Sequence, residues 1–162
     1  MKENKEYLAY LGECYVQLEL AKRRFKTFKM FNFSCDLIGE NWAKIEIKSA
    51  LPSWCRAYKE KVNKTYEYKH WQFRVTTEGQ RESDFFICVP FESLDQPPLG
   101  FFIFPRGSLK TLGKSDIISV FESDIKGYFK KSNKENKFKY LNNWDLILKF
   151  KEETRQENLS TL

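Results

Sequence analysis

The chain has 162 residues, a formal net charge of +6 and 41% hydrophobic residues, with 15 Phe, 8 Tyr and 4 Trp. This length predicts a single domain, and such an aromatic content excludes wholesale disorder. Because the chain contains no run of about 18 apolar residues, and its first residues lack the pattern of a signal peptide, we expect neither a transmembrane helix nor an export signal. The excess of basic residues favours a polyanionic partner such as nucleic acid.

The first third of the chain predicts one helix followed by short strands. Apolar residues recur at helical spacing over residues 5–23, which indicates a helix. Strands are expected at 24–31, 34–39 and 42–50. In the last of these, alternation places two sets of side chains on opposite faces. One face carries Trp42, Lys44, Glu46 and Lys48, and the other carries Ala43, Ile45, Ile47 and Ser49.

The remaining segments complete a mixed sheet. Residues 50–69 are expected to form a long basic connection, with a short helix near Pro52. Further strands are expected at 70–77, 84–91 and 101–105, and residues 117–123 fit either a strand or a helix. Residues 126–139 are expected to form an exposed loop, and residues 140–153 a terminal helix. This order predicts an α/β fold with a central mixed sheet flanked by helices. We expect one domain over 1–150 and a flexible tail over 151–162.

Several kinds of active site are poorly supported by the sequence. Cys14, Cys35, Cys55 and Cys88 lie far apart and form no CxxC pair, so we expect reduced thiols in a cytoplasmic protein and no zinc centre. The chain has one histidine, His70, and neither a phosphate-binding glycine loop nor a G-x-S-x-G motif. Nucleotide hydrolysis of the P-loop type and serine hydrolase chemistry are therefore not indicated.

Three charged residues stand in a segment that otherwise predicts buried sheet. Glu46 and Lys48 are two positions apart, so their side chains share a face, and Asp36 lies on the preceding strand of a predicted hairpin. Charges are rarely buried unless they are paired or bound to a metal. Either this strand face is solvated, or the three residues form a site. Two carboxylates offer hard ligands for Mg²⁺, and an ammonium group can offset charge on a phosphoryl group.

The same residues resemble the PD-(D/E)xK nucleases, which have the restriction-endonuclease-like fold. The motif stands here as Asp36, nine residues, and then Glu46-Ile47-Lys48. Cys35 occupies the place of the proline that usually precedes the aspartate. Residues 12–49 look like the N-terminal half of this nuclease core. The later segments are similar to small members allied to Holliday-junction resolvases and to homing and restriction endonucleases.

The resemblance implies a role for each matching residue. Asp36 and Glu46 would bind Mg²⁺, with Mn²⁺ as a substitute, and the backbone carbonyl of Ile47 would be a third ligand. Lys48 would position or activate the attacking water. The further members of the expected site are Glu13 in the first helix, which would complete the ligand shell directly or through water, and Gln72 on a later strand.

The basic and aromatic stretch 54–69 fits a nucleic-acid groove. Trp54 and Tyr58 would stack or wedge, and the phosphate contacts would come from Arg56, Lys59, Lys61 and Lys64. The alternative is a solvated loop that covers buried aromatic rings.

Together these features predict a Mg²⁺-dependent endodeoxyribonuclease that hydrolyses DNA phosphodiester bonds, with DNA as its partner and a two-fold homodimer as a possible assembly. One alternative is a catalytically inactive nucleic-acid-binding module on the same fold. Another is a protein-interaction domain with an incidental positive charge.

Overall fold

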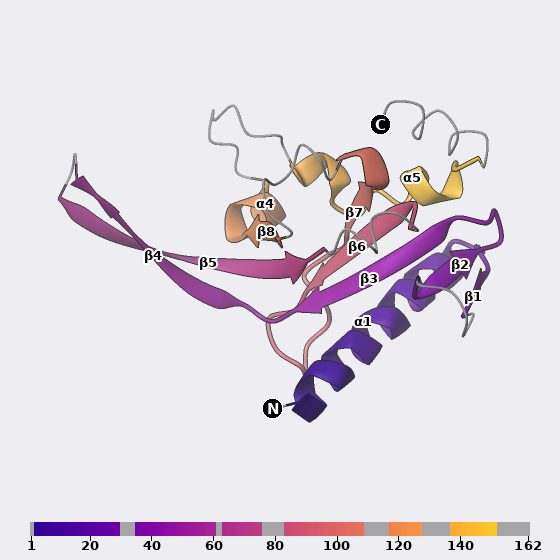
Figure 1. Ribbon diagram of the computed structural model, residues 1–162, viewed down its shortest axis with the longest axis horizontal. Coiled ribbons are helices and arrows are strands. Elements are labelled where there is room, and N and C mark those ends of the chain that lie inside the picture. Colours follow the sequence, from indigo (N-terminus) through magenta and orange to yellow (C-terminus); the bar gives the residue numbers. More distant parts are fainter. Residues whose placement is uncertain are drawn as a thin grey trace.

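A five-stranded mixed sheet forms the centre of the molecule (Figure 1). The computed structural model describes residues 2–29, 35–60, 63–75, 83–108, 117–127 and 137–151. The strands follow the order β1 (Thr27–Phe28), β2 (Leu37–Gly39), β3 (Lys44–Ala50), β6 (Phe85–Pro90) and β7 (Phe102–Pro105). β3 and β6 are parallel, and the other neighbours are antiparallel. The predicted α/β class with a central mixed sheet is confirmed.

One face of this sheet is covered by helix α1 (Lys2–Lys22). The predicted helix over residues 5–23 is therefore confirmed. Leu8, Val16 and Leu20 are buried in the same cluster as the β3 residues Ile45 and Ile47. The helix approaches the strand closely at Gly12, where an added Cβ would lie 1.9 Å from the Ser49 hydroxyl oxygen. The short helix α5 (Asp145–Leu148) packs on the same face, because Ile147 joins this cluster.

The other face is covered by a second, three-stranded sheet rather than by a long helix. Its order is β4 (Ser53–Lys59), β5 (Lys64–Arg74) and β8 (Ile117–Phe121). Trp71 and Phe73 of β5 are buried in one cluster with Phe86 and Phe102 of the central sheet. The Trp71 indole N–H also donates to the Phe91 carbonyl at 2.7 Å. Short helical turns complete the described structure: η2 (Arg106–Ser108), α4 (Glu122–Lys126) and η3 (Lys137–Tyr140).

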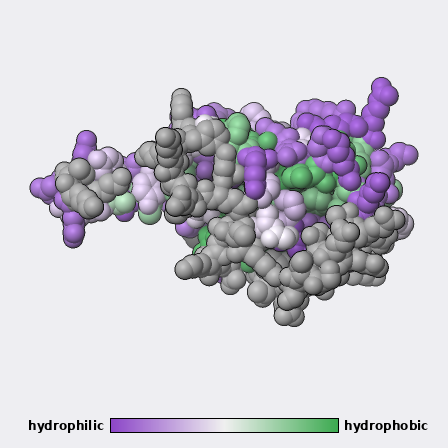
Figure 2. All heavy atoms as spheres, turned by 90° about the horizontal axis from the view of Figure 1, so that it is seen from above, coloured by the Kyte–Doolittle hydropathy of each residue, from purple (hydrophilic) through white to green (hydrophobic). Residues whose placement is uncertain are grey.

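β4 and the outer half of β5 form an antiparallel ribbon, here called the arm, that projects from the body of the molecule (Figures 1 and 2). The expectation of a long connection with a short helix over residues 50–69 is therefore wrong. Most residues of the arm are exposed, and β4 shows no regular alternation of apolar and polar residues, the pattern that identifies a half-buried strand.

The C-terminal helix is shorter than expected. The helical spacing suggested residues 140–153, but α5 spans only Asp145–Leu148. Asn142 has a φ of 53°, which interrupts a right-handed helix, and its side-chain oxygen accepts a hydrogen bond from the Phe101 amide at 3.0 Å. The ambiguous segment 117–123 divides into β8 and the start of α4. Most of the predicted loop 126–139 and tail 151–162 lies outside the described residues. Within the described part of the chain, no helix has the length and apolarity needed to cross a membrane.

Candidate active site

The candidate site forms where β2 and β3 cease to pair. The last paired residues are Leu37 and Ile45, and the chain before Leu37 stays against the edge of β3. The Asp36 amide donates to the Ile45 carbonyl at 3.0 Å, and the Asp36 Oδ2 accepts a hydrogen bond from the Ile47 amide at 2.6 Å. These two bonds fix the Asp36 carboxylate at the edge of β3, just beyond the point where its pairing with β2 ends.

The same edge carries the backbone carbonyl of Ile47. The N–H and C=O groups of one strand residue point to the same side of the strand. Because the Ile47 N–H points to Asp36, its carbonyl oxygen also projects to that edge and away from β6. The predicted third ligand therefore lies on the same side of β3 as the Asp36 carboxylate.

Glu46 and Lys48 lie on the face of β3 that points away from α1. Glu46 is only 8% exposed, and its carboxylate forms an ion pair with the Lys48 ammonium. Lys48 is half-buried. A purely solvated strand face, the alternative left open by the sequence, is therefore wrong for Glu46.

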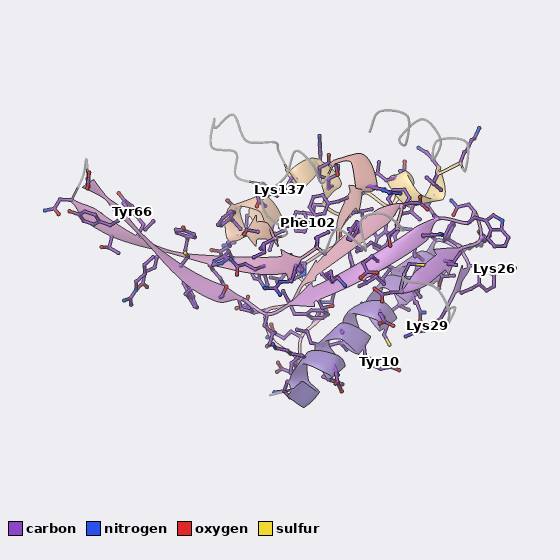
Figure 3. The ribbon with its side chains drawn as sticks, in the orientation of Figure 1. Tyr10, Lys26, Lys29, Tyr66, Phe102 and Lys137 are labelled. Carbon is purple, nitrogen blue, oxygen red and sulfur yellow. The ribbon has the colours of Figure 1, made fainter. Side chains whose placement is uncertain are left out.

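Glu13 approaches the site from helix α1. Its carboxylate accepts a hydrogen bond from the Lys29 ammonium at 2.6 Å, and Lys29 follows β1 at the edge of the sheet (Figure 3). Asp36 and Glu13 both act to raise the pKa of Glu46, so the three carboxylates lie within electrostatic range of one another. The structure thus places Glu13, Asp36, Glu46 and Lys48 within electrostatic range of one another.

Burial sets the acidity of the two central carboxylates. Burial raises the pKa of Asp36 above its ordinary value, although the hydrogen bond from the Ile47 amide opposes this shift. Burial also raises the pKa of Glu46, while the ion pair with Lys48 opposes it. In both residues burial is the largest cause. Removing these carboxylates from water therefore disfavours their charged forms, and a nearby cation would restore them.

Gln72 does not join the other site residues. It is exposed on β5, where it alternates with Trp71 and Phe73, whose side chains pack toward the central sheet. Gln72 therefore points to the opposite face of the second sheet. The expectation assumed that Gln72 lies on a strand close to the site, whereas the neighbours of β3 in the central sheet are β2 and β6.

Sequence reasoning missed Lys29. This residue stands between Asp36 and Glu13 in the chain and belongs to no motif, and its contact with Glu13 spans 16 residues. Glu13 raises the pKa of Lys29, and Asp36 adds a smaller effect of the same sign. Two lysines thus hold two of the three carboxylates. Across the described ranges, no three Asp, Glu, His or Cys side chains are grouped closely enough to hold a metal ion as they stand.

The arm carries the predicted nucleic-acid contacts. Trp54 and Tyr58 are 69% and 59% exposed and share one face of β4 with Arg56, which pairs with Glu67 across the ribbon at 2.7 Å. The Lys64 ammonium lies 5.6 Å from the centre of the Tyr66 ring. Lys59 ends β4, and Lys61 lies outside the described residues.

The arrangement of the whole chain is similar to that of a solved structure described as a bacterial homing endonuclease, I-Ssp6803I. The two structures superpose with a TM-score of 0.60 over 93% of this chain and 95% of that chain, at 18% sequence identity. This likeness shows that the chain has the fold of that endonuclease. No protein-family model matches the sequence, and the comparison with curated proteins gave no significant match.

Proposed function

We propose that this protein is a metal-dependent endodeoxyribonuclease of the PD-(D/E)xK type. The observation that carries the proposal is the hydrogen bond between the Asp36 carboxylate and the backbone of Ile47, the residue between the buried Glu46 and the half-buried Lys48 that pairs with it. The fold shared with a homing endonuclease supports DNA as the substrate.

The donor groups at this edge fit a hard divalent cation. The Asp36 and Glu46 carboxylates and the Ile47 carbonyl are oxygen ligands of the kind that Mg²⁺ and Mn²⁺ accept. Burial of both carboxylates favours a cation beside them. Glu13 would take part directly or through a water molecule. When bound, the ion would polarise the scissile phosphate and lower the pKa of the attacking water.

Lys48 is the residue we propose to act on the reacting groups. The Lys48 side chain is half-buried, and its ammonium group pairs with Glu46, which holds it beside that carboxylate. From this place it would orient the attacking water and offset negative charge on the phosphoryl oxygens. Gln72 has no role in this proposal, because its side chain points away from the central sheet.

The arm would hold the duplex beside the site. A two-stranded ribbon fits the major groove of B-DNA, and Arg56 and Lys64 offer charges for phosphates, to which we expect Lys59 and Lys61 to add. Trp54 and Tyr58 add exposed rings on the same ribbon.

A catalytically inactive DNA-binding module is the second candidate. It is favoured by the pairing of Glu46 with Lys48 and of Glu13 with Lys29, which neutralises two carboxylates without any metal. A module of this kind would gain little thermal stability from Mg²⁺ or Mn²⁺.

The two candidates separate in one experiment. Supercoiled plasmid is incubated with the wild-type protein, with Lys48→Ala and with Lys149→Ala, a control that removes an exposed lysine of the C-cap of α5. Each protein is assayed with Mg²⁺, with Mn²⁺ and with EDTA, and its Tm is measured under the same conditions. Nicking that needs the metal and is lost only in Lys48→Ala supports the nuclease. Cleavage in EDTA, or full cleavage by Lys48→Ala, contradicts it. Absence of both cleavage and metal stabilisation supports the binding module.

A further inference from the structure

Helix α1 carries an uncharged stripe on the side that faces away from the sheet. The stripe consists of Tyr7, Tyr10, Cys14, Leu18 and Ala21. At about 100° per residue these five positions fall within roughly a quarter of the helix circumference, opposite the face that buries Leu8, Val16 and Leu20. Tyr7, Tyr10 and Leu18 are 52%, 62% and 49% exposed. Figure 3 shows Tyr10 projecting from the helix on its outer side.

This stripe differs from scattered surface hydrophobics. Single exposed apolar residues are ordinary, but a continuous apolar stripe along a helix marks a contact with another element. Successive members of the stripe are three, four, four and three residues apart, a spacing that keeps all five on one helix face and is symmetric about Cys14. The stripe runs for about 21 Å along the helix axis.

The order of residues in the stripe is suited to a second copy of the same helix in the opposite direction. A two-fold axis at Cys14 sets Tyr7 against Ala21 of the second copy, and Tyr10 against its Leu18. A large side chain then meets a small one at each end of the seam, and Cys14 meets its own equivalent at the centre. Antiparallel packing also opposes the two helix dipoles favourably.

We propose that two copies of this protein associate through an antiparallel contact between their α1 stripes, with the two-fold axis at Cys14. The contact is isologous, so it closes as a dimer.

The position of the stripe relates this dimer to the candidate active site. Tyr10 lies near Cys14, Lys29 and Glu13, since each of them affects its pKa, and the hydrogen bond with Cys14 is the largest cause of the raised pKa of Tyr10. The two-fold axis is perpendicular to the plane that contains both helices. Rotation about it therefore keeps any residue on the same side of that plane in both copies. Glu13 of both copies therefore faces that side. Here the inference rests on the proposed function, because one duplex lying across the axis would meet both sites.

The seam also limits the strength of the contact. One short stripe per copy places the contact at the low end of interface sizes, below roughly 1,200 Å² in total. We therefore expect a dimer that dissociates at micromolar concentration and is held together when both copies share one duplex.

Cysteine cross-linking without DNA or metal tests the contact directly. All four cysteines are free thiols, Cys35 and Cys88 are buried, and Cys55 lies on the arm. The protein with Cys55→Ser is treated at about 100 μM with the thiol oxidant diamide, which is reduced as two thiols join. We expect a disulfide-linked dimer on a non-reducing gel, and its loss when Cys14→Ser is added. Absence of the dimer, or its persistence without Cys14, overturns the proposal.

A second set of variants tests the direction of packing. In protein that carries both Cys14→Ser and Cys55→Ser, Tyr7→Cys and Ala21→Cys are prepared as separate proteins. We expect each variant to cross-link poorly alone, and a mixture of the two variants to form a disulfide between Tyr7→Cys of one copy and Ala21→Cys of the other. Parallel helices would instead cross-link each variant with itself, which would contradict the proposal. Sedimentation velocity at the same concentration should show Leu18→Glu shifted to monomer with an unchanged Tm. None of these measurements depends on DNA cleavage. If no dimer forms, the nuclease proposal is unaffected, and if the protein does not cleave DNA, the dimer proposal is unaffected.

Discussion

The Asp36 carboxylate accepts a hydrogen bond of 2.6 Å from the backbone amide of Ile47, although the two residues belong to different segments of the sheet. This bond does two things at once. It satisfies the Ile47 amide beyond the last paired residues of β2 and β3, and it places a carboxylate oxygen on the same side of β3 as the Ile47 carbonyl. The contribution of Asp36 to stability and its proposed contribution to metal binding can therefore be measured separately, by removing only its charge.

Asp36→Asn keeps an oxygen that accepts the Ile47 amide but removes the negative charge. We expect its unfolding free energy to stay at or above the wild-type value, while its affinity for Mn²⁺ falls at least about 10-fold. Asp36→Ala removes the acceptor as well, so it should lose about 1–3 kcal/mol of stability because a poorly solvated amide is left unpaired. Urea denaturation and metal titration by calorimetry measure the two effects. Equal metal affinity for wild type and Asp36→Asn would remove Asp36 from the ligand set.

Glu46→Gln should stabilise the protein in the absence of metal. Burial raises the pKa of Glu46 despite the opposing ion pair with Lys48, so the folded state holds a proton more tightly than the unfolded state does. A raised carboxylate pKa gives stability that is present below the ordinary pKa of about 4 and is lost as the pH rises through the folded-state value. In EDTA, the Tm of Glu46→Gln should therefore exceed that of wild type at pH 7, and the difference should shrink below pH 4.

The control for this comparison is Asp145→Asn, which changes an exposed carboxylate of α5. Its difference in Tm from wild type should not follow the same pH course. With Mn²⁺ present the sign for Glu46→Gln should reverse, because only the wild-type protein gains stability from the ion. A Tm for Glu46→Gln below that of wild type at pH 7 in EDTA would show that the ion pair with Lys48 outweighs burial.

The sequence predicted the residues of the candidate site better than the surroundings that hold them. Asp36, Glu46 and Lys48 could be found because their spacing is short and local, and the helical repeat indicated that Glu13 lies on a helix. Gln72 was placed wrongly because the order of strands in the sheet depends on the parallel pairing of β3 with β6, which is a contact between distant segments. The arm was missed because β4 is mostly exposed and its sequence shows no regular apolar alternation, so only its pairing with β5 reveals it as a strand.

Lys29 illustrates the limit most clearly. Its ion pair with Glu13 depends on how β1 and α1 pack, and no local pattern reports such a contact. In the metal-free protein Lys29 competes with any cation for the Glu13 carboxylate. Lys29→Met should therefore raise the affinity for Mn²⁺ by about 1.5- to 5-fold, the range expected for an exposed ion pair. Lys26→Met removes a neighbouring exposed lysine of the same segment, and should leave the affinity unchanged (Figure 3).

Glu67 on the arm offers a test of DNA binding in which affinity should rise. It pairs with Arg56 at 2.7 Å, and both side chains are well exposed. Glu67→Gln removes a negative charge and leaves Arg56 available to a phosphate, so binding to a non-cleavable duplex at 50 mM salt should tighten roughly 2- to 5-fold. Arg56→Gln should weaken binding. It should also reduce the slope of log Kd against log salt concentration by about 1, because one phosphate contact is lost. Fluorescence anisotropy across a salt series, with EDTA to prevent cleavage, measures both changes. If both variants bind as wild type does, the duplex does not contact this part of the arm, and the nuclease would have to hold DNA through other basic residues.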